Sequence, residues 1–280
     1  MTDAAVTDPA VTDPTATARA YRLARIAPLA ECMRGARLLT TGFVIATQVF
    51  LYAELWRALY AHTTTVAGLD VRQAVTYSTL ATLATTARAM RGATGESVKT
   101  RILDGSIAYW FLRPVSARRY RAWYGVGEAL YSSAWVVVGL ALGLGLGLVA
   151  PPASAAVAAV SAVSFGLGLV VLYYLTVLID VIAFWTVSTD GVTRFYDFVQ
   201  ALLSGALIPV WFLPGWLGGL TTRLPFAAGV STPISLYAGR IPLADALPVL
   251  AGQVGWCAVL AMVTAVLWRR AGRRLVVLGG

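Results

Sequence analysis

The chain has 280 residues, of which 58% are hydrophobic and only 12% are charged, and its mean hydropathy is +0.72. Soluble domains carry about 25% charged residues, so this composition leaves too little polar surface to cover a water-soluble fold. The net charge of +9 could favour a nucleic-acid-binding protein, but the basic residues lie in blocks between apolar runs. That pattern is typical of an integral membrane protein.

The N-terminal segment is polar and repetitive, since AVTDP occurs at residues 5–9 and again at residues 10–14. Recurring aspartates and prolines disfavour both helix and burial. The sequence therefore predicts a disordered cytoplasmic tail over residues 1–18.

Apolar runs long enough to cross a bilayer occur six times in the rest of the chain. About 20 mostly apolar residues cross the roughly 30 Å hydrocarbon core as a helix. Spans are predicted at residues 38–60, 72–90, 123–149, 155–185, 192–213 and 246–268, which together form an all-α transmembrane domain over residues 38–268. The second run is small and hydroxylated, so we expect it to pack among other helices rather than face lipid.

Lysine and arginine are distributed unevenly between the two sets of connecting segments. Of the 22 basic residues, all but four lie in residues 19–37, 88–121, at position 194 or in residues 269–274. Cytoplasmic loops retain basic residues, so both termini are predicted to be cytoplasmic, including the basic C-terminus at residues 269–280. We therefore expect a multi-pass protein of the plasma membrane.

The segment between the second and third predicted spans, residues 91–122, is too long and too charged for a simple turn. In ESVKTRILDG, Val98 and Ile102 share a helical face, Glu96 lies near the start, and Gly105 is placed to end the helix. This pattern predicts a short helix at the cytoplasmic surface. The apolar IAYWFLRP stretch that follows is expected to lie at the membrane interface without crossing it.

Two stretches of this chain resemble ABC type-2 transporter permeases. RILDGSIAYWFLRPVS is similar to the cytoplasmic loop of that family, whose leucine-arginine-proline turn matches Leu112, Arg113 and Pro114. SGALIPVWFLPGWLGGLTTRLPFAAGVSTPISLYAGRI resembles the family's fifth span and outer re-entrant segment, which is expected at residues 209–228. ARAYRLARIAPLAECMRGA resembles its interfacial helix, expected at residues 19–37. The prolines that should break the re-entrant segment into short helical pieces are Pro209, Pro214 and Pro225.

The resemblance implies a permease that associates with a second permease, identical or related, and docks a cytoplasmic ABC ATPase. It implies ATP and Mg in that partner and no nucleotide site in this chain, which also contains no GxxxxGK[ST] sequence. The short cytoplasmic helix would then be the element that couples the ATPase to the spans. Its expected contact residues are Glu96, Val98, Lys99, Arg101, Ile102, Leu103, Asp104 and Gly105.

Aromatic residues of the first and fifth predicted spans are candidates for lining the pathway, because the family places these spans beside it. They are Tyr52, Trp56, Phe195, Phe198, Trp211 and Phe212. Such a lining would favour a hydrophobic or amphiphilic cargo, such as a drug, a natural product or a lipid-like molecule. Tryptophan and tyrosine also form ordinary interfacial belts, so that alternative stays open.

Ionisable residues within predicted spans need an explanation, since each is costly in hydrocarbon. Glu54 and Arg57 are three residues apart and are predicted to pair near the outer end of the first span. Glu128 and Asp180 are expected to extend to the cytoplasmic interface. His62 is the only histidine, and no grouping of residues predicts a metal site or nucleophilic catalysis.

The sequence therefore favours the permease subunit of an ABC exporter, which is not itself an enzyme. Two alternatives remain: a polytopic membrane enzyme acting on a lipid-linked substrate, and an ion-driven secondary transporter. An enzyme should place several polar groups at one depth, and an ion-driven carrier should show internal repeats with broken helices at the midplane.

Overall fold

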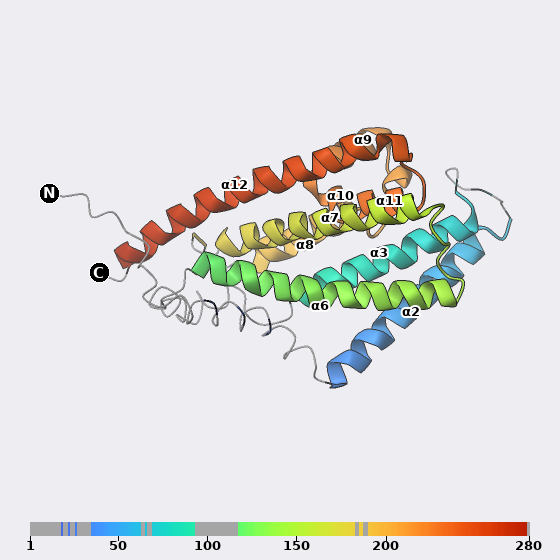
Figure 1. The fold of residues 1–280 in the computed structure, drawn as a ribbon, viewed down its shortest axis with the longest axis horizontal. Helices are drawn as coiled ribbons and strands as arrows, with labels where there is room; N and C mark the ends of the chain where they lie inside the picture. The colour runs from blue at the N-terminus through green and yellow to red at the C-terminus, as the bar shows by residue number, and fades with distance from the viewer. Residues whose placement is uncertain are drawn as a thin grey trace.

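A computed structural model describes the fold as a bundle of long helices. It describes residues 35–62, 65, 69–92, 117–182, 185–186 and 190–278, and single residues at 18, 22 and 26. The long helices are α2 (Gly35–Leu59), α3 (Val71–Gly92), α6 (Ala117–Gly145), α7 (Ala155–Ile182), α8 (Asp190–Leu203) and α12 (Ala246–Leu278). Figure 1 shows α3, α6, α7 and α12 running along the long axis, with α2 crossing at an angle. Every regular element in the described ranges is a helix.

Four helices in the described part of the chain are long and apolar enough to cross a bilayer. They span Leu39–Leu59, Arg119–Gly145, Ala155–Ile182 and Leu243–Ala271, and they coincide with the first, third, fourth and sixth predicted spans. Helices also form at the second and fifth positions, but α3 is rich in polar residues and α8 has only 14 residues. In the described ranges the all-helical fold with several membrane-spanning helices is confirmed, whereas the count of six spans remains a prediction.

Several helix ends differ from the prediction. The fifth helix ends at Leu203 instead of residue 213, because Gly205 turns the chain with a positive φ of 75°. α6 ends at Gly145 instead of residue 149, since Gly147 also has a positive φ, of 70°. α12 continues past residue 268 to Leu278, because arginine and leucine have good helix propensity and no proline interrupts the segment.

Short helices connect α8 to α12, where the sequence predicts a re-entrant segment. They are η1 (Val210–Phe212), α9 (Gly215–Arg223), α10 (Pro225–Ala228), α11 (Ser231–Tyr237) and η2 (Leu243–Asp245). Pro209 and Pro214 immediately precede η1 and α9, and Pro225 is the first residue of α10. Proline lacks a backbone N–H, so it is tolerated at a helix start but not in the interior. The three prolines thus divide the segment into separate pieces, which gather toward the end of the bundle where α12 begins (Figure 1).

α3 occupies the centre of the bundle, between α2 and α6 and against α11. Its residues 74–79 and 81–84 are buried. The hydroxyls of Thr76, Thr82 and Thr85 each donate a hydrogen bond to the carbonyl one turn earlier, at 2.8–2.9 Å. Because these polar groups are satisfied within the helix, α3 can be buried despite its composition. This burial agrees with the expectation that the second span packs among other helices.

α7 packs along α12 and holds the short helices through a buried amide. The side chain of Gln253 on α12 donates hydrogen bonds to the carbonyls of Ser164 (3.1 Å) and Ala228 (2.7 Å). The Ser164 hydroxyl donates in turn to the Gln253 side-chain oxygen at 2.9 Å. Nearby, a Cβ placed on Gly168 would lie only 2.9 Å from the Ala228 carbonyl oxygen. The absence of a side chain at this position therefore lets α10 approach the backbone of α7.

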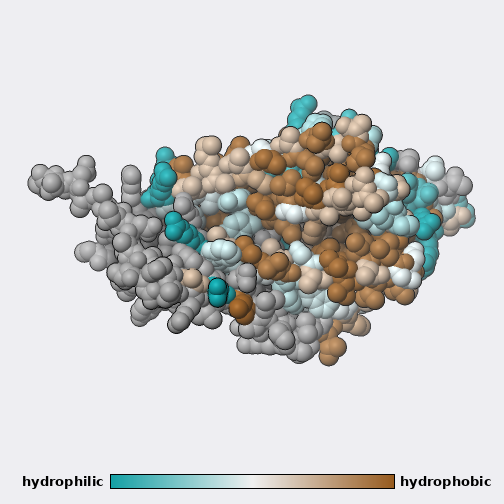
Figure 2. Space-filling view, viewed as in Figure 1, coloured by the Kyte–Doolittle hydropathy of each residue, from teal (hydrophilic) through white to brown (hydrophobic). Residues whose placement is uncertain are grey.

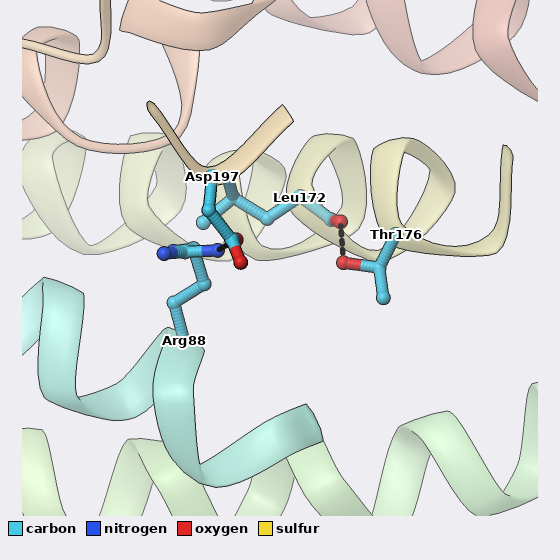
Figure 3. Close-up of polar contacts among 4 residues, drawn as sticks. All are labelled: Arg88, Leu172, Thr176 and Asp197. Atoms are coloured by element: carbon cyan, nitrogen blue, oxygen red, sulfur yellow. Dashed lines mark hydrogen bonds and ion pairs between the residues drawn. The ribbon is translucent and has the colours of Figure 1, made fainter. Parts of the chain in front are cut away.

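An ion pair ties α8 to α3. The Arg88 guanidinium donates to the Asp197 carboxylate at 3.0 Å, as Figure 3 shows. The same view shows the Thr176 hydroxyl on α7 donating to the carbonyl of Leu172 at 2.9 Å, which satisfies it within its own helix. α8 therefore has a polar anchor on α3 even though few of its residues pack on other elements.

Large apolar side chains are exposed on the outer faces of the bundle. They include Leu39, Phe43 and Phe50 on α2, Val137 and Leu142 on α6, and Leu247 and Met262 on α12. Figure 2 shows the apolar surface continuing across neighbouring helices, with hydrophilic residues concentrated toward the two ends. Apolar surface of this extent requires contact with lipid or another protein.

Candidate functional site

A cavity of about 370 Å³ lies between α2, α3 and the chain that joins α8 to η1. Its lining residues are Tyr52, Leu55, Trp56, Leu59, Tyr77, Ser78, Ala206, Leu207, Ile208, Pro209 and Phe212. The α2 residues of this set follow the spacing i, i+3, i+4 and i+7, so they form one face of the helix. The cavity wall is therefore built from apolar and aromatic side chains contributed by three separate parts of the chain.

Trp56 is the fixed centre of this wall. Its side chain is buried, and its indole Nε1–H donates to the Ser78 hydroxyl at 2.6 Å. Its ring lies 5.8 Å from the ring of Phe212 and 6.1 Å from that of Tyr60. Tyr60 is held in turn, since its hydroxyl donates to the Leu69 carbonyl at 3.0 Å. These contacts fix the orientation of the indole ring before any ligand enters.

A second aromatic pair supports the turn that closes the cavity. The Tyr77 hydroxyl donates to the carbonyl of Gly205 at 2.7 Å, and its ring meets Trp211 edge to face, with centroids 4.6 Å apart. The Arg240 guanidinium lies 5.0 Å from the centroid of the Trp211 ring. Trp211 therefore supports the cavity wall from behind and is not one of the lining residues.

The structure brings together only part of the predicted pathway set. Tyr52, Trp56 and Phe212 line the same cavity. Phe195 and Phe198 lie on α8 with 68% and 65% of their surface exposed, away from the cavity. The exposure of these two side chains fits contact with lipid or with another protein as well as it fits a role in the pathway.

Sequence reasoning missed the contribution of α3 to the cavity. Leu55 and Leu59 could have been found by helical spacing from Tyr52, since they lie three and seven residues further along α2. No comparable signal identifies Tyr77 and Ser78, because their position depends on how α3 packs against α2.

The predicted contact residues for the ATPase, Glu96 to Gly105, and the Leu112–Arg113–Pro114 turn lie outside the described residues. Their assignments remain predictions from the sequence. The same holds for most of the interfacial segment predicted at residues 19–37, of which only 22, 26 and 35–37 are described, and for the tail at residues 1–17.

Buried charge in α6 requires a correction to the prediction for Glu128. Its carboxylate does not extend to the interface but accepts a hydrogen bond from Arg121 at 3.0 Å, and the two side chains are only 3% and 6% exposed, respectively. α6 begins at Ala117, earlier than predicted, so both residues lie on one helix face two turns apart. The Arg121 guanidinium also lies 5.8 Å from the ring centroid of Tyr173 and interacts electrostatically with Asp180 on α7.

Glu54 and Arg57 form the ion pair that the sequence predicts, near the C-terminal end of α2. Both side chains remain substantially exposed, at 47% and 59%. In the described part of the chain, no three or more histidine, cysteine, aspartate or glutamate residues are grouped to hold a metal ion.

The comparison with protein families matches residues 43–279 to the model for ABC-2 family transporter proteins. Neither a curated protein nor a solved structure gives a significant match. The matched region contains the aromatic cavity, the buried charges and the short helices, and it covers most of the chain. It agrees with the resemblance carried by the cytoplasmic loop and the proline-rich segment. The chain therefore belongs to the ABC-2 transporter family and is a membrane permease of that family.

Proposed function

We propose that this chain is the transmembrane permease subunit of an ABC exporter that moves a hydrophobic or amphiphilic substrate. The family supports a role in transport. The observation that carries the substrate class is the aromatic cavity beside α2, whose lining is almost wholly apolar. Its volume of about 370 Å³ suits a small molecule. A drug, a natural product or a lipid-like molecule would fit such a wall.

The cavity wall favours apolar ligands because its main polar groups already form hydrogen bonds within the protein. The Trp56 indole N–H and the Ser78 hydroxyl bond to each other. The rings of Tyr52, Trp56 and Phe212 would bind cargo by dispersion and, for a cationic amphiphile, through their ring faces. α2 and the α8–η1 connection both line the cavity, and a second permease placed beside them would complete the pathway.

The proposed membrane arrangement has six spans, including α3 and α8, with both termini in the cytoplasm. Arg88 near the end of α3, Arg119 near the start of α6 and Arg269 near the end of α12 support it, because these helix ends gather at one end of the bundle (Figure 1). α8 is about 21 Å long, so the following turn and η1 would complete the crossing. The short helices over residues 209–228 would then dip into the outer leaflet.

Cysteine labelling in intact cells tests this orientation. Single cysteines near Leu217 should react with an impermeant reagent from outside, whereas those near Ser116 should react only after permeabilisation. The reverse pattern would contradict the proposed orientation.

Partner binding is proposed for the segment from Glu96 to Gly105, with ATP and Mg held by separate cytoplasmic ATPase subunits. Val98, Ile102 and Leu103 would bury apolar side chains in a groove of the ATPase, while charged neighbours pair at its rim. Buried anchors contribute more to an interface than rim charges do. Ile102 is therefore the residue whose replacement separates an ATPase-driven permease from an enzyme or an ion-driven carrier.

The decisive experiment compares Ile102→Asp with Lys99→Ala, a matched change at the expected rim. An unpaired charge against an apolar surface costs several kcal/mol if no water reaches it. Co-purification of the ATPase should therefore collapse for Ile102→Asp and persist for Lys99→Ala, while membrane insertion is normal for both. Undiminished association of Ile102→Asp would refute the coupling role. Transport by the parent protein without ATP would refute the exporter itself.

A further inference from the structure

We propose that a groove on a different face of α2 from the aromatic cavity binds one phospholipid, with an acyl chain in the groove and the phosphate on Arg57. The groove encloses about 490 Å³ between α2, α3 and α6. Placing this lipid in the outer leaflet rests on the proposed orientation. The site itself depends only on the geometry of the three helices.

Helix packing leaves this groove open. α2 and α6 each pack along α3 but barely contact each other, so they form two walls above a floor that α3 supplies with Thr79 and Leu83. At Gly139 of α6, a Cβ would collide with the Leu83 side chain, which shows how closely α6 sits on the floor. The floor is therefore sealed, and the opening is along the outer side between α2 and α6.

The two walls are apolar except at the end that carries Glu54 and Arg57. On α2 the lining runs from Gly42 through Val49 and Phe50 to Arg57, with the spacing of a single helix face. On α6 it includes Trp135 and Leu142. An apolar groove on a chain whose outer faces carry exposed apolar side chains is open to lipid chains rather than to water.

The length of the groove fits one acyl chain. Gly42 and Arg57 are 15 residues apart on α2, which corresponds to about 22 Å at about 1.5 Å per residue. A single leaflet contributes about half of a hydrocarbon core of roughly 30 Å. The groove thus runs from the end of α2 past the depth of one leaflet, long enough for a full chain.

Charge at one end of the groove identifies the headgroup. Arg57 lies two residues before the end of α2, at the level expected for lipid headgroups, and lines the groove together with its partner Glu54. The guanidinium has five N–H donors, and the Arg57 side chain remains 59% exposed after pairing. A phosphate is the headgroup element that this fork recognises best. A charged end and an apolar body together match a phospholipid rather than a free anion or a neutral hydrocarbon.

The lipid site and the candidate pathway use different faces of α2. Tyr52 and Trp56 face the aromatic cavity, whereas Ala53 and Arg57 face the groove. A bound lipid would therefore contact α2 on a face that does not line the pathway, and it would not enter the pathway.

The test uses the full chain in dodecyl maltoside micelles, which carry no phosphate of their own, with a trace of phosphatidylglycerol that has a photoreactive acyl chain. Cross-linked residues are located by mass spectrometry. Labelling should concentrate on the groove residues of α2 and α6. Gly42→Leu is the main variant, because a side chain there enters open space and fills the groove without a clash. Gly255→Leu on α12 is the matched control, since it also meets nothing within 4 Å and lies outside the groove.

Gly42→Leu should lower groove labelling at least about fivefold, and Gly255→Leu should leave it unchanged. Ala46→Phe, a second groove-filling change, should act in the same direction. Arg57→Gln should weaken competition by unlabelled phosphatidylglycerol about tenfold, as expected for loss of a charge-assisted hydrogen bond. Arg223→Gln on α9 should have no effect, because Arg223 does not line the groove.

Labelling spread evenly over all the exposed helices would overturn the proposal, because it would indicate a general lipid shell. Equal labelling of Gly42→Leu and the parent would also overturn it. A diacylglycerol probe that competes as well as phosphatidylglycerol would overturn the assignment of the phosphate to Arg57. None of these measurements requires ATPase or transport, so the failure of the exporter function and the failure of the lipid site are distinguishable.

Discussion

Replacing Gly168 with alanine should displace α10 from α7. The new Cβ would lie 2.9 Å from the Ala228 carbonyl oxygen and 3.2 Å from the backbone of Gly229. Both neighbours are backbone atoms, so they cannot yield by rotating a side chain. Overpacking of this kind costs about 1–3 kcal/mol. Alanine is also favoured over glycine in a helix by about 1 kcal/mol, which partly offsets the clash.

Gly166→Ala is the matched control, because the same helix carries this glycine with nothing within 4 Å of its added Cβ. The gain in helix propensity is the same for both variants, so their difference isolates the clash. We expect Gly168→Ala to be less stable than Gly166→Ala by about 1–3 kcal/mol. At about 2–4 °C per kcal/mol for a chain of this size, thermal denaturation in detergent should separate them by several degrees.

Transport should show the same order, because α10 belongs to the segment proposed to dip into the outer leaflet. Gly168→Ala should transport less than Gly166→Ala at equal expression. Equal melting temperatures and equal transport for the two variants would refute the close approach of α10 to α7.

Three further predictions concern the cavity and the buried charges. Trp56→Phe should retain substrate binding but lose about 1 kcal/mol of stability, because the hydrogen bond to Ser78 is lost while an aromatic ring remains. Thermal denaturation measures the stability and substrate-stimulated ATP hydrolysis measures the binding. A larger loss of binding than of stability would contradict this prediction. Glu128→Gln should destabilise the protein by about 1–3 kcal/mol, because it removes the carboxylate that is hydrogen-bonded to the buried Arg121 guanidinium and leaves Asp180 to compensate the charge. Replacing both Arg121 and Glu128 with glutamine should recover part of the loss, and a melting temperature unchanged in the single variant would refute the pairing. Gly205→Ala should cost at least about 1–2 kcal/mol, because its φ of 75° disfavours a side chain, and an unaffected melting temperature would argue against this turn.

The membrane class, the helical fold and the family follow from the sequence alone. Hydrocarbon forces long apolar segments into helices. Hydropathy therefore locates four membrane-spanning helices, and most of their ends lie within a few residues of the predicted positions. Proline positions likewise predict where the segment between α8 and α12 is broken, since a missing N–H acts locally. The loop and re-entrant motifs point to a permease without any knowledge of tertiary contacts.

Only the tertiary structure shows which side chains of different helices contact one another. Helical spacing shows that Tyr52 and Trp56 share a face of α2, but it cannot show that Phe212 and Ser78 meet that face while Phe195 and Phe198 do not. Such neighbours depend on how helices distant in sequence pack around α3.

The buried charge in α6 illustrates the same limit within a single helix. Arg121 is assigned to a loop when only apolar residues define the span, and Glu128 then lacks a partner. Once α6 begins at Ala117, the two side chains share a face and are buried together against α7. Composition and periodicity therefore determine which segments enter the membrane, because each segment responds to lipid on its own. Packing determines which side chains meet, because that depends on the shapes of all the helices together.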